Sequence, residues 1–152
     1  MPEPTASPVT ERRADYRYFL AMPTRWMDND TYGHVNNVTY YSYFDTVVNE
    51  HLIRVGGLDI ERAPVVGYVV ESMCRYREPL SFPETLDAGM RVVRLGTSSV
   101  TYEIAIFRQG HDEPAATGRF VHVWVARATQ RPAPIPARIK AALELLVVGA
   151  TS

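Results

Sequence analysis

The sequence predicts one α+β domain in which an antiparallel sheet packs against a single long helix. Apolar residues recur at helical spacing from Val38 to Leu52. After Gly56 and Gly57 the apolar period changes to two over four successive segments, which is typical of strands. Short turns rich in glycine, proline and serine join most of these segments, as in an antiparallel meander.

Length and composition are those of one ordinary globular domain. The chain has 152 residues, of which 46% are hydrophobic and 22% are charged. Residues 1–14 are rich in proline and charge, so we expect a flexible tail there. The domain is expected over 15–148, with a short C-terminal tail over 149–152.

Charge and cysteine content limit the possible partners and the compartment. A net charge of −1 argues against nucleic acid as the main partner. Cys74 is the single cysteine, so no internal disulfide forms, which fits a reducing compartment. No apolar run approaches the roughly 18 residues that span a bilayer. These features predict a cytoplasmic location and no membrane span.

The elements are expected in the order strand, loop, long helix, four strands and a short helix. A strand over 16–26 precedes the loop, and Pro23 marks its later part as an edge or a break. The helix begins at Val38, is capped by Asn36 or Asn37, and runs for about 17 residues to the glycine pair. The four strands are expected over 65–76, 85–95, 100–109 and 115–128, and Pro136 fits the start of the last helix.

Alternation along these strands predicts which side chains share a face. Within 65–76 it places Val69, Glu71, Met73 and Arg75 on one side of the sheet. Within 115–128, His122 alternates with aromatic residues and is expected to be structural.

The loop before the long helix concentrates the polar residues that carry chemistry. Asp28, Asn29, Asp30 and Gly33 are turn formers, and the loop ends at the start of a buried helix. Unpaired backbone N–H groups gather at such a helix start and suit a developing oxyanion.

The Asp-x-Asp-x-x-Gly-His-Val-Asn-Asn string, followed by an aromatic-rich helix, resembles the hotdog-fold acyl-CoA thioesterases of the 4-hydroxybenzoyl-CoA thioesterase type. Weaker matches follow over 75–79, 93–99 and 118–125, so that the resemblance covers about residues 16–147. It implies a sheet wrapped around one long central helix. It also implies a homodimer whose sheets join, or a homotetramer built from such dimers, with a site at the subunit interface near the helix start.

The resemblance also assigns residues. Asp30 matches the catalytic carboxylate of the family, and Asn37 falls where the family donates a backbone N–H to the thioester carbonyl. His34 and Glu71 are the further catalytic candidates; His34 acts either as a general acid and base or by orienting Asp30. The candidates for oxyanion or substrate binding are Asn37, Asn36, Tyr32 and Gly33.

Each candidate also has an ordinary structural interpretation. Asp28 has the same chemistry as Asp30 but is interpreted as a turn acid. Asn36 and Asn37 serve most simply as helix caps. Glu71 is interpreted more simply as a paired or solvated strand acid. Arg127, Arg131 and Arg138 could meet a coenzyme A phosphate, although exposed arginines are common.

The function expected from the sequence is hydrolysis of an acyl-CoA or acyl-carrier-protein thioester, with Asp30 as nucleophile or general base. No metal or other cofactor is expected, since the histidines and the lone cysteine show no ligand spacing. Two alternatives stay open: a hotdog enoyl-thioester hydratase or dehydratase, and a non-catalytic acyl-CoA binding module. Acyl-chain preference is not fixed by the sequence.

Overall fold

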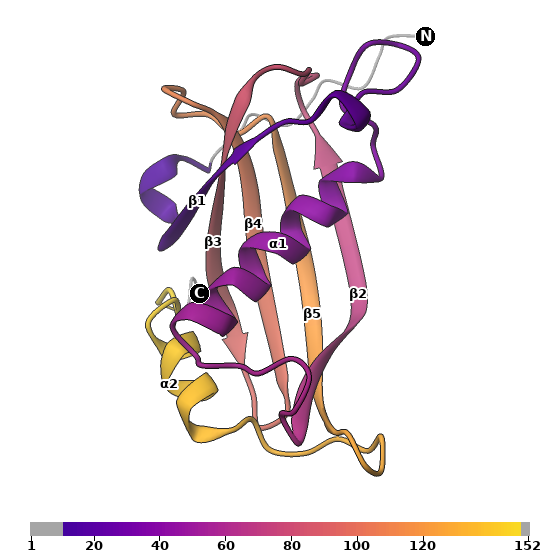
Figure 1. Ribbon diagram of the computed structural model, residues 1–152. Helices are drawn as coiled ribbons and strands as arrows, with labels where there is room; N and C mark the ends of the chain where they lie inside the picture. Colours follow the sequence, from indigo (N-terminus) through magenta and orange to yellow (C-terminus); the bar gives the residue numbers. More distant parts are fainter. Residues whose placement is uncertain (1–10, 150–152) are drawn as a thin grey trace, which may run out of the picture.

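A computed structural model describes residues 11–149, which form a five-stranded antiparallel sheet with one long helix lying across one of its faces (Figure 1). The strand order is β1-β3-β4-β5-β2, so β1 and β2 are the two edges. A smaller helix, α2, lies near the end of α1 (Figure 1). The strands are β1 (Tyr18–Pro23), β2 (Val65–Tyr76), β3 (Thr85–Leu95), β4 (Ser99–Arg108) and β5 (Ala116–Ala126), and the helices are α1 (Thr39–Arg54) and α2 (Ala137–Glu144).

The expected element order is confirmed, with small differences at the ends. The first strand stops at Pro23, and a 3₁₀ turn, Trp26–Asp28, follows it. The long helix starts at Thr39, one residue later than expected, and has 16 residues. Both Asn36 and Asn37 accept the N–H of Val38 through their side-chain oxygens, each at 3.0 Å, so the two candidate caps share one donor.

The core lies between α1 and the inward face of the sheet. Phe44, Val47 and Val48 of α1 are fully buried, and the Phe44 ring meets Phe120 of β5 edge to face with centroids 5.8 Å apart. Beside this contact the sheet carries Gly118, where a Cβ would overlap the Phe44 ring. A side chain at that position would therefore push α1 off the sheet.

Strand β2 departs from simple alternation. Its pairing with β5 shifts between Val69, which faces His122, and Glu71, which faces Val121. Because paired residues share a face and His122 and Val121 point to opposite faces, the bulge separates Val69 from Glu71. The expectation that these two side chains lie on one side is therefore wrong. Glu71 points to the outward face, away from α1.

The predicted N-terminal tail falls largely outside the described residues, as do residues 150–152. Its last part is described and contacts the domain. Arg13 starts a 3₁₀ turn, Arg13–Asp15, pairs with Asp87 at 2.9 Å, and stacks over the Phe107 ring at 4.8 Å. The folded domain thus includes residues before position 15.

His122 is buried in the core, in accord with its expected structural role. It is 2% exposed, and its Nδ1 lies 3.3 Å from the Tyr102 hydroxyl. Burial lowers the pKa of His122 from 6.5 to about 4. The folded protein therefore holds a neutral imidazole under conditions in which the unfolded chain binds a proton.

Acid should destabilise the domain through His122. Since its folded pKa lies below the unfolded one, stability is full above about pH 6.5 and is lost as the pH falls toward 4. Between pH 7.5 and 5 we expect a loss of about 2 kcal/mol from this residue. Urea unfolding of wild type and His122→Gln at pH 7.5 and pH 5 measures this loss of unfolding free energy. Equal pH dependence in the two proteins would contradict the assignment.

Candidate functional site

The polar loop before α1 is a small hairpin, residues 28–36, closed by its own backbone. Asp28 accepts the N–H of Asn36 at 2.8 Å, and Asp30 donates its N–H to His34 at 2.9 Å. At the tip, the Asp30 side chain accepts the N–H of Tyr32 at 2.9 Å. Gly33 closes the turn with a φ of 81°, a conformation that a residue with a Cβ adopts at a cost. Asp30 is therefore held at the start of a defined turn.

The base of the hairpin is tied to α1 through Asp28. The Asp28 carboxylate is 1% exposed and accepts the Tyr43 hydroxyl of α1 at 2.8 Å. It also accepts the Arg25 backbone N–H at 2.9 Å and pairs with the Arg25 guanidinium at 3.0 Å. Burial alone would raise the pKa of Asp28, but the hydrogen bonds from Arg25 and Tyr43 outweigh it and hold the pKa below its ordinary value.

The segment after β2 holds the other side of the hairpin. Leu80 accepts the Val35 N–H at 2.7 Å, Ser81 donates its hydroxyl to Gly33 at 2.9 Å, and Phe82 donates its N–H to the Asn29 side chain at 3.0 Å. Arg108 of β4 fixes this segment in turn, because its guanidinium bonds to Glu84 at 2.6 Å and to Glu78 at 2.8 Å.

Beside the hairpin lies an open cavity of about 340 Å³. Three of the residues expected at the site line it: Asp30, His34 and Asn37. The remaining lining comes from the hairpin, the first turn of α1, the end of β2 and the segment after it: Val35, Tyr40, Tyr76, Arg77, Glu78 and Pro79. The structure thus brings the candidate carboxylate and the helix start to one hollow.

Tyr76 ties the residue before α1 to the wall of this hollow. Its hydroxyl donates to the Asn37 carbonyl at 2.7 Å, and its ring meets Tyr40 edge to face with centroids 5.0 Å apart. Within residues 11–149, no protein group accepts the N–H of Asn37. That donor is free for a ligand, as expected for the first amides of a helix.

The two tyrosines of the cavity wall and the neighbouring Cys74 are neutral at ordinary pH. Burial raises the pKa of Tyr40 to about 12 and that of Tyr76 above its usual range. Cys74 is half-buried behind Tyr76, and burial raises its pKa to about 11, so it is a thiol and a poor nucleophile. In the sequence, Tyr76 belongs only to the weak match over 75–79. No sequence pattern indicates its bond to Asn37.

Other expected residues lie elsewhere. Gly33 and Asn36 line a second recess, of about 740 Å³, which Asp30 also borders, together with Trp26 and Met27. Tyr32 is 85% exposed at the tip. Glu71 is exposed on the outward face of β2 and does not line the Asp30 cavity in the same chain.

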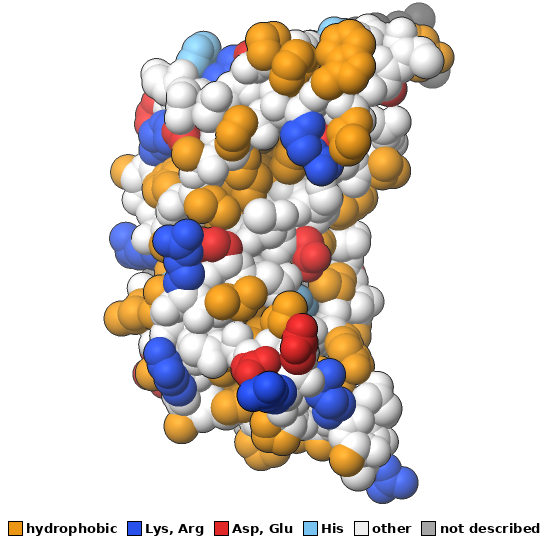
Figure 2. Space-filling model, in the orientation of Figure 1, with side chains coloured by type: hydrophobic (Ala, Val, Ile, Leu, Met, Phe, Trp, Pro, Cys, Tyr) orange, Lys and Arg blue, Asp and Glu red, His pale blue; other side chains and the backbone are white. Residues whose placement is uncertain are grey.

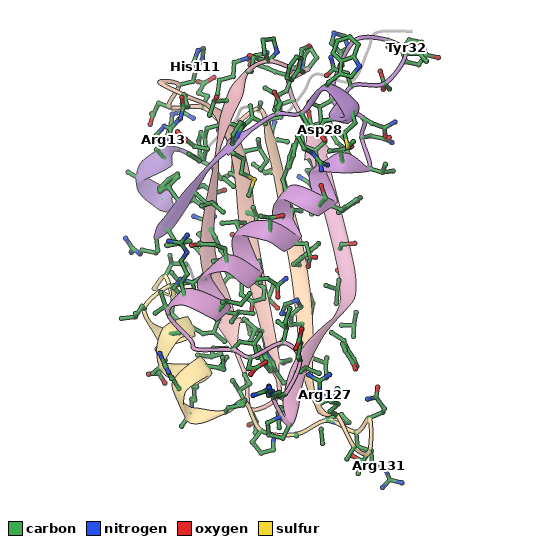
Figure 3. All side chains as sticks on the ribbon, viewed as in Figure 1. Arg13, Asp28, Tyr32, His111, Arg127 and Arg131 are labelled. Atoms are coloured by element: carbon green, nitrogen blue, oxygen red, sulfur yellow. The ribbon has the colours of Figure 1, made fainter. Side chains whose placement is uncertain are left out.

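Two of the suggested phosphate-binding arginines, Arg127 and Arg131, lie far from the hairpin within one chain. Figure 3 places Arg127 and Arg131 at one end of the molecule and Asp28 and Tyr32 at the other. Arg127 donates to the carbonyls of Ala63 and Ile60 and thereby fixes the connection before β2. The end that carries the hairpin is instead rich in exposed apolar side chains (Figure 2), among them Trp26 and Met27.

No metal site accompanies the hairpin in the described part of the chain, where no three His, Cys, Asp or Glu side chains are grouped to hold an ion. None of the helices described is long and apolar enough to cross a bilayer. The groups that surround the cavity are the Asp30 carboxylate, the His34 imidazole and the free backbone N–H of Asn37. This set suits acyl transfer to water at an activated carbonyl.

Known proteins share this architecture. The PA5185 protein of Pseudomonas aeruginosa strain PAO1 is 52% identical, with a TM-score of 0.90 over 93% of this chain and 99% of that one. A Thermus thermophilus thioesterase solved with coenzyme A and Zn is 29% identical, with a TM-score of 0.72 over 87% and 95%. The Bacillus subtilis protein YsmA is 26% identical over 120 residues, which are 79% of this chain and 80% of YsmA.

Residues 24–143 match the family described as the thioesterase-like superfamily. The fold and the match together define a hotdog-type enzyme that acts on thioesters. The chain belongs to the thioesterase-like superfamily.

Two glycines provide a matched test of the hairpin turn. Gly33 and Gly110 have φ values of 81° and 80°, and at both an added Cβ would meet nothing within 4 Å. Alanine at either position should cost about 1 kcal/mol of unfolding free energy through backbone strain alone. Only Gly33→Ala should also lower thioester hydrolysis, because Gly33 shapes the turn that begins at Asp30. Chemical denaturation and a free-thiol assay separate the two effects; equal activities would contradict this role.

Proposed function

We propose that the protein hydrolyses an acyl-CoA thioester to the free acid and coenzyme A, with Asp30 as its catalytic carboxylate. The observation that carries this proposal is the shared cavity of Asp30 and Asn37. A thioester carbonyl placed there would meet the free N–H of Asn37 on its oxygen and a carboxylate near its carbon. Membership of the thioesterase-like superfamily supports the same reaction class.

The reaction follows from the charge that develops on the carbonyl oxygen. Asp30 either attacks the carbonyl carbon, giving an anhydride that water then opens, or deprotonates a water that attacks directly. In both routes the C–S bond breaks, the acyl group gains the water oxygen, and the thiolate of coenzyme A takes up a proton. The Asn37 N–H would stabilise the oxyanion by about 2.7–4 kcal/mol, as a well-placed donor does.

His34 is the second side chain that we assign to the reaction. It lies at the exposed mouth of the same cavity, and its backbone carbonyl is bound to the Asp30 N–H. From there the imidazole can relay the proton that the leaving thiolate needs, or hold the Asp30 carboxylate by a hydrogen bond. Within one chain, Glu71 does not line the cavity that holds Asp30 and His34, and we give it no role in the reaction.

A panel of acyl-CoA and acyl-carrier-protein thioesters tests the proposal. Asp30→Asn should lower free-thiol release by about 10²–10⁴-fold, because the amide neither attacks nor accepts a proton. Asp45→Asn makes the same change on the exposed face of α1 and should retain the wild-type rate.

Equal rates for wild type and Asp30→Asn would refute the role of Asp30. Addition of water to an enoyl-CoA without thiol release would favour a hydratase, and tight acyl-CoA binding without turnover of any thioester would favour a binding module.

We further propose that the chain works as a homodimer joined through β2. This strand is an edge of the sheet, and Tyr68, Val69 and Val70 along it are exposed. An edge strand offers unpaired backbone donors and acceptors that a second copy can pair with by two-fold symmetry. Tyr76 at the end of β2 lines the Asp30 cavity, so such pairing would bring the second copy next to the site.

A lysine at the centre of this edge should prevent the pairing. Val70 is 60% exposed, and Val70→Lys places a charge where a second sheet would pack. Sedimentation at micromolar concentration should give dimers for wild type and monomers for Val70→Lys. Leu145→Lys, which charges a similarly exposed apolar site after α2, should leave the dimer intact. Monomeric wild type, or dimeric Val70→Lys, would contradict the assignment.

A further inference from the structure

The first acid of the hairpin, Asp28, has a chemical environment opposite to that of Asp30. Asp30 lies at the tip and borders two recesses, whereas the Asp28 carboxylate is 1% exposed. Arg25 donates to this carboxylate through its backbone N–H and its guanidinium, and Tyr43 donates through its hydroxyl. A buried carboxylate with that many charge-assisted and hydroxyl donors is held in one position.

The two ends of the Asp28–Tyr43 hydrogen bond belong to the two parts of the site. Asp28 closes the hairpin through its own carbonyl, which accepts the Asn36 N–H, so a movement of Asp28 moves the stem below Asp30. Tyr43 lies on α1, one turn after Tyr40, and the two rings are in contact with centroids 6.0 Å apart. Tyr40 in turn contacts Tyr76, which bonds to the carbonyl of Asn37. The Asp28–Tyr43 bond therefore connects the carboxylate-bearing hairpin, through Tyr40 and Tyr76, to the residue that carries the free N–H.

We propose that Asp28 and Tyr43 are positioning residues that set the Asp30 carboxylate at its working separation from the start of α1. This inference rests on the proposed role of Asp30. The hydrogen bonds from Arg25 and Tyr43 keep Asp28 ionised, and an ionised carboxylate, which only accepts, takes the Arg25 donors and the Tyr43 hydroxyl together. The Tyr43 hydroxyl is in turn kept as a donor, because burial and the neighbouring Asp28 charge raise its pKa above the usual range.

Tyr43→Phe tests the inference with a minimal change, since it removes one oxygen and leaves the ring in the core. A displacement of Asp30 by a fraction of an ångström should lower kcat by about 10- to 100-fold. KM should stay within about twofold, because none of the cavity-lining side chains is altered. Tyr102→Phe is the matched control: it also removes a buried hydroxyl, which bonds to His122 in the core, and should leave kcat unchanged.

A double-mutant cycle tests whether the two residues act as one unit. Asp28→Asn turns an acceptor oxygen into a donor that faces the donors of Arg25 and Tyr43, so it should lower kcat at least as much as Tyr43→Phe. Adding Tyr43→Phe to Asp28→Asn should then cost less than about twofold more. Full additivity of the two losses would overturn the coupling.

Amide hydrogen exchange measures how firmly the hairpin stem is closed, and it requires no substrate. The N–H groups of Asp30 and Asn36 close the hairpin stem and should exchange about tenfold faster in Tyr43→Phe, but at the wild-type rate in Tyr102→Phe. If the wild type hydrolyses thioesters and Tyr43→Phe changes neither kcat nor this exchange, the inference is wrong. If the wild type hydrolyses none, the proposed function fails, and unchanged exchange in Tyr43→Phe would still overturn the positioning role by itself.

Discussion

The close packing of α1 on the sheet is the constraint on which the rest of the structure depends. Phe44 can lie against β5 only because Gly118 offers no Cβ at the point of contact. With the helix that close, its first turn reaches the end of β2, and Tyr76 bonds to the carbonyl of Asn37. A helix held a few ångströms further from the sheet would lose this bond, and with it the link between the start of the helix and the end of β2.

The hairpin before α1 uses its two acids in different ways. Asp28 is buried, and its burial is tolerated because Arg25 and Tyr43 satisfy the carboxylate. Asp30, two residues later, uses one oxygen to accept the Tyr32 N–H and faces a cavity. Because successive residues of an extended strand point in opposite directions, a spacing of two would place both acids on one side; the turn that starts at Asp30 separates them. One acid holds the loop, and the other is left for chemistry.

The sequence was sufficient for the parts of this arrangement that follow from local patterns. Helical spacing located the start of α1 to within a residue, and alternation predicted β2 and β3 over the residues that they occupy. It failed at β2, where one extra residue near Val70 turns Glu71 to the outward face, because a bulge leaves no local signature in a strand of apolar and polar residues. The Asp28–Tyr43 contact depends on how a loop folds back on a helix, and no periodicity encodes that.

The central claim is that one hollow presents a carboxylate and a helix-start N–H to the two sides of a thioester carbonyl. A crystal structure with a non-hydrolysable acyl-CoA analogue, whose carbonyl is kept and whose sulfur is replaced by a methylene, tests it directly. We expect the carbonyl oxygen about 2.7–3.1 Å from the Asn37 nitrogen, with the Asp30 carboxylate facing the carbonyl carbon. An analogue bound elsewhere, or bound with its carbonyl turned away from both groups, would contradict it.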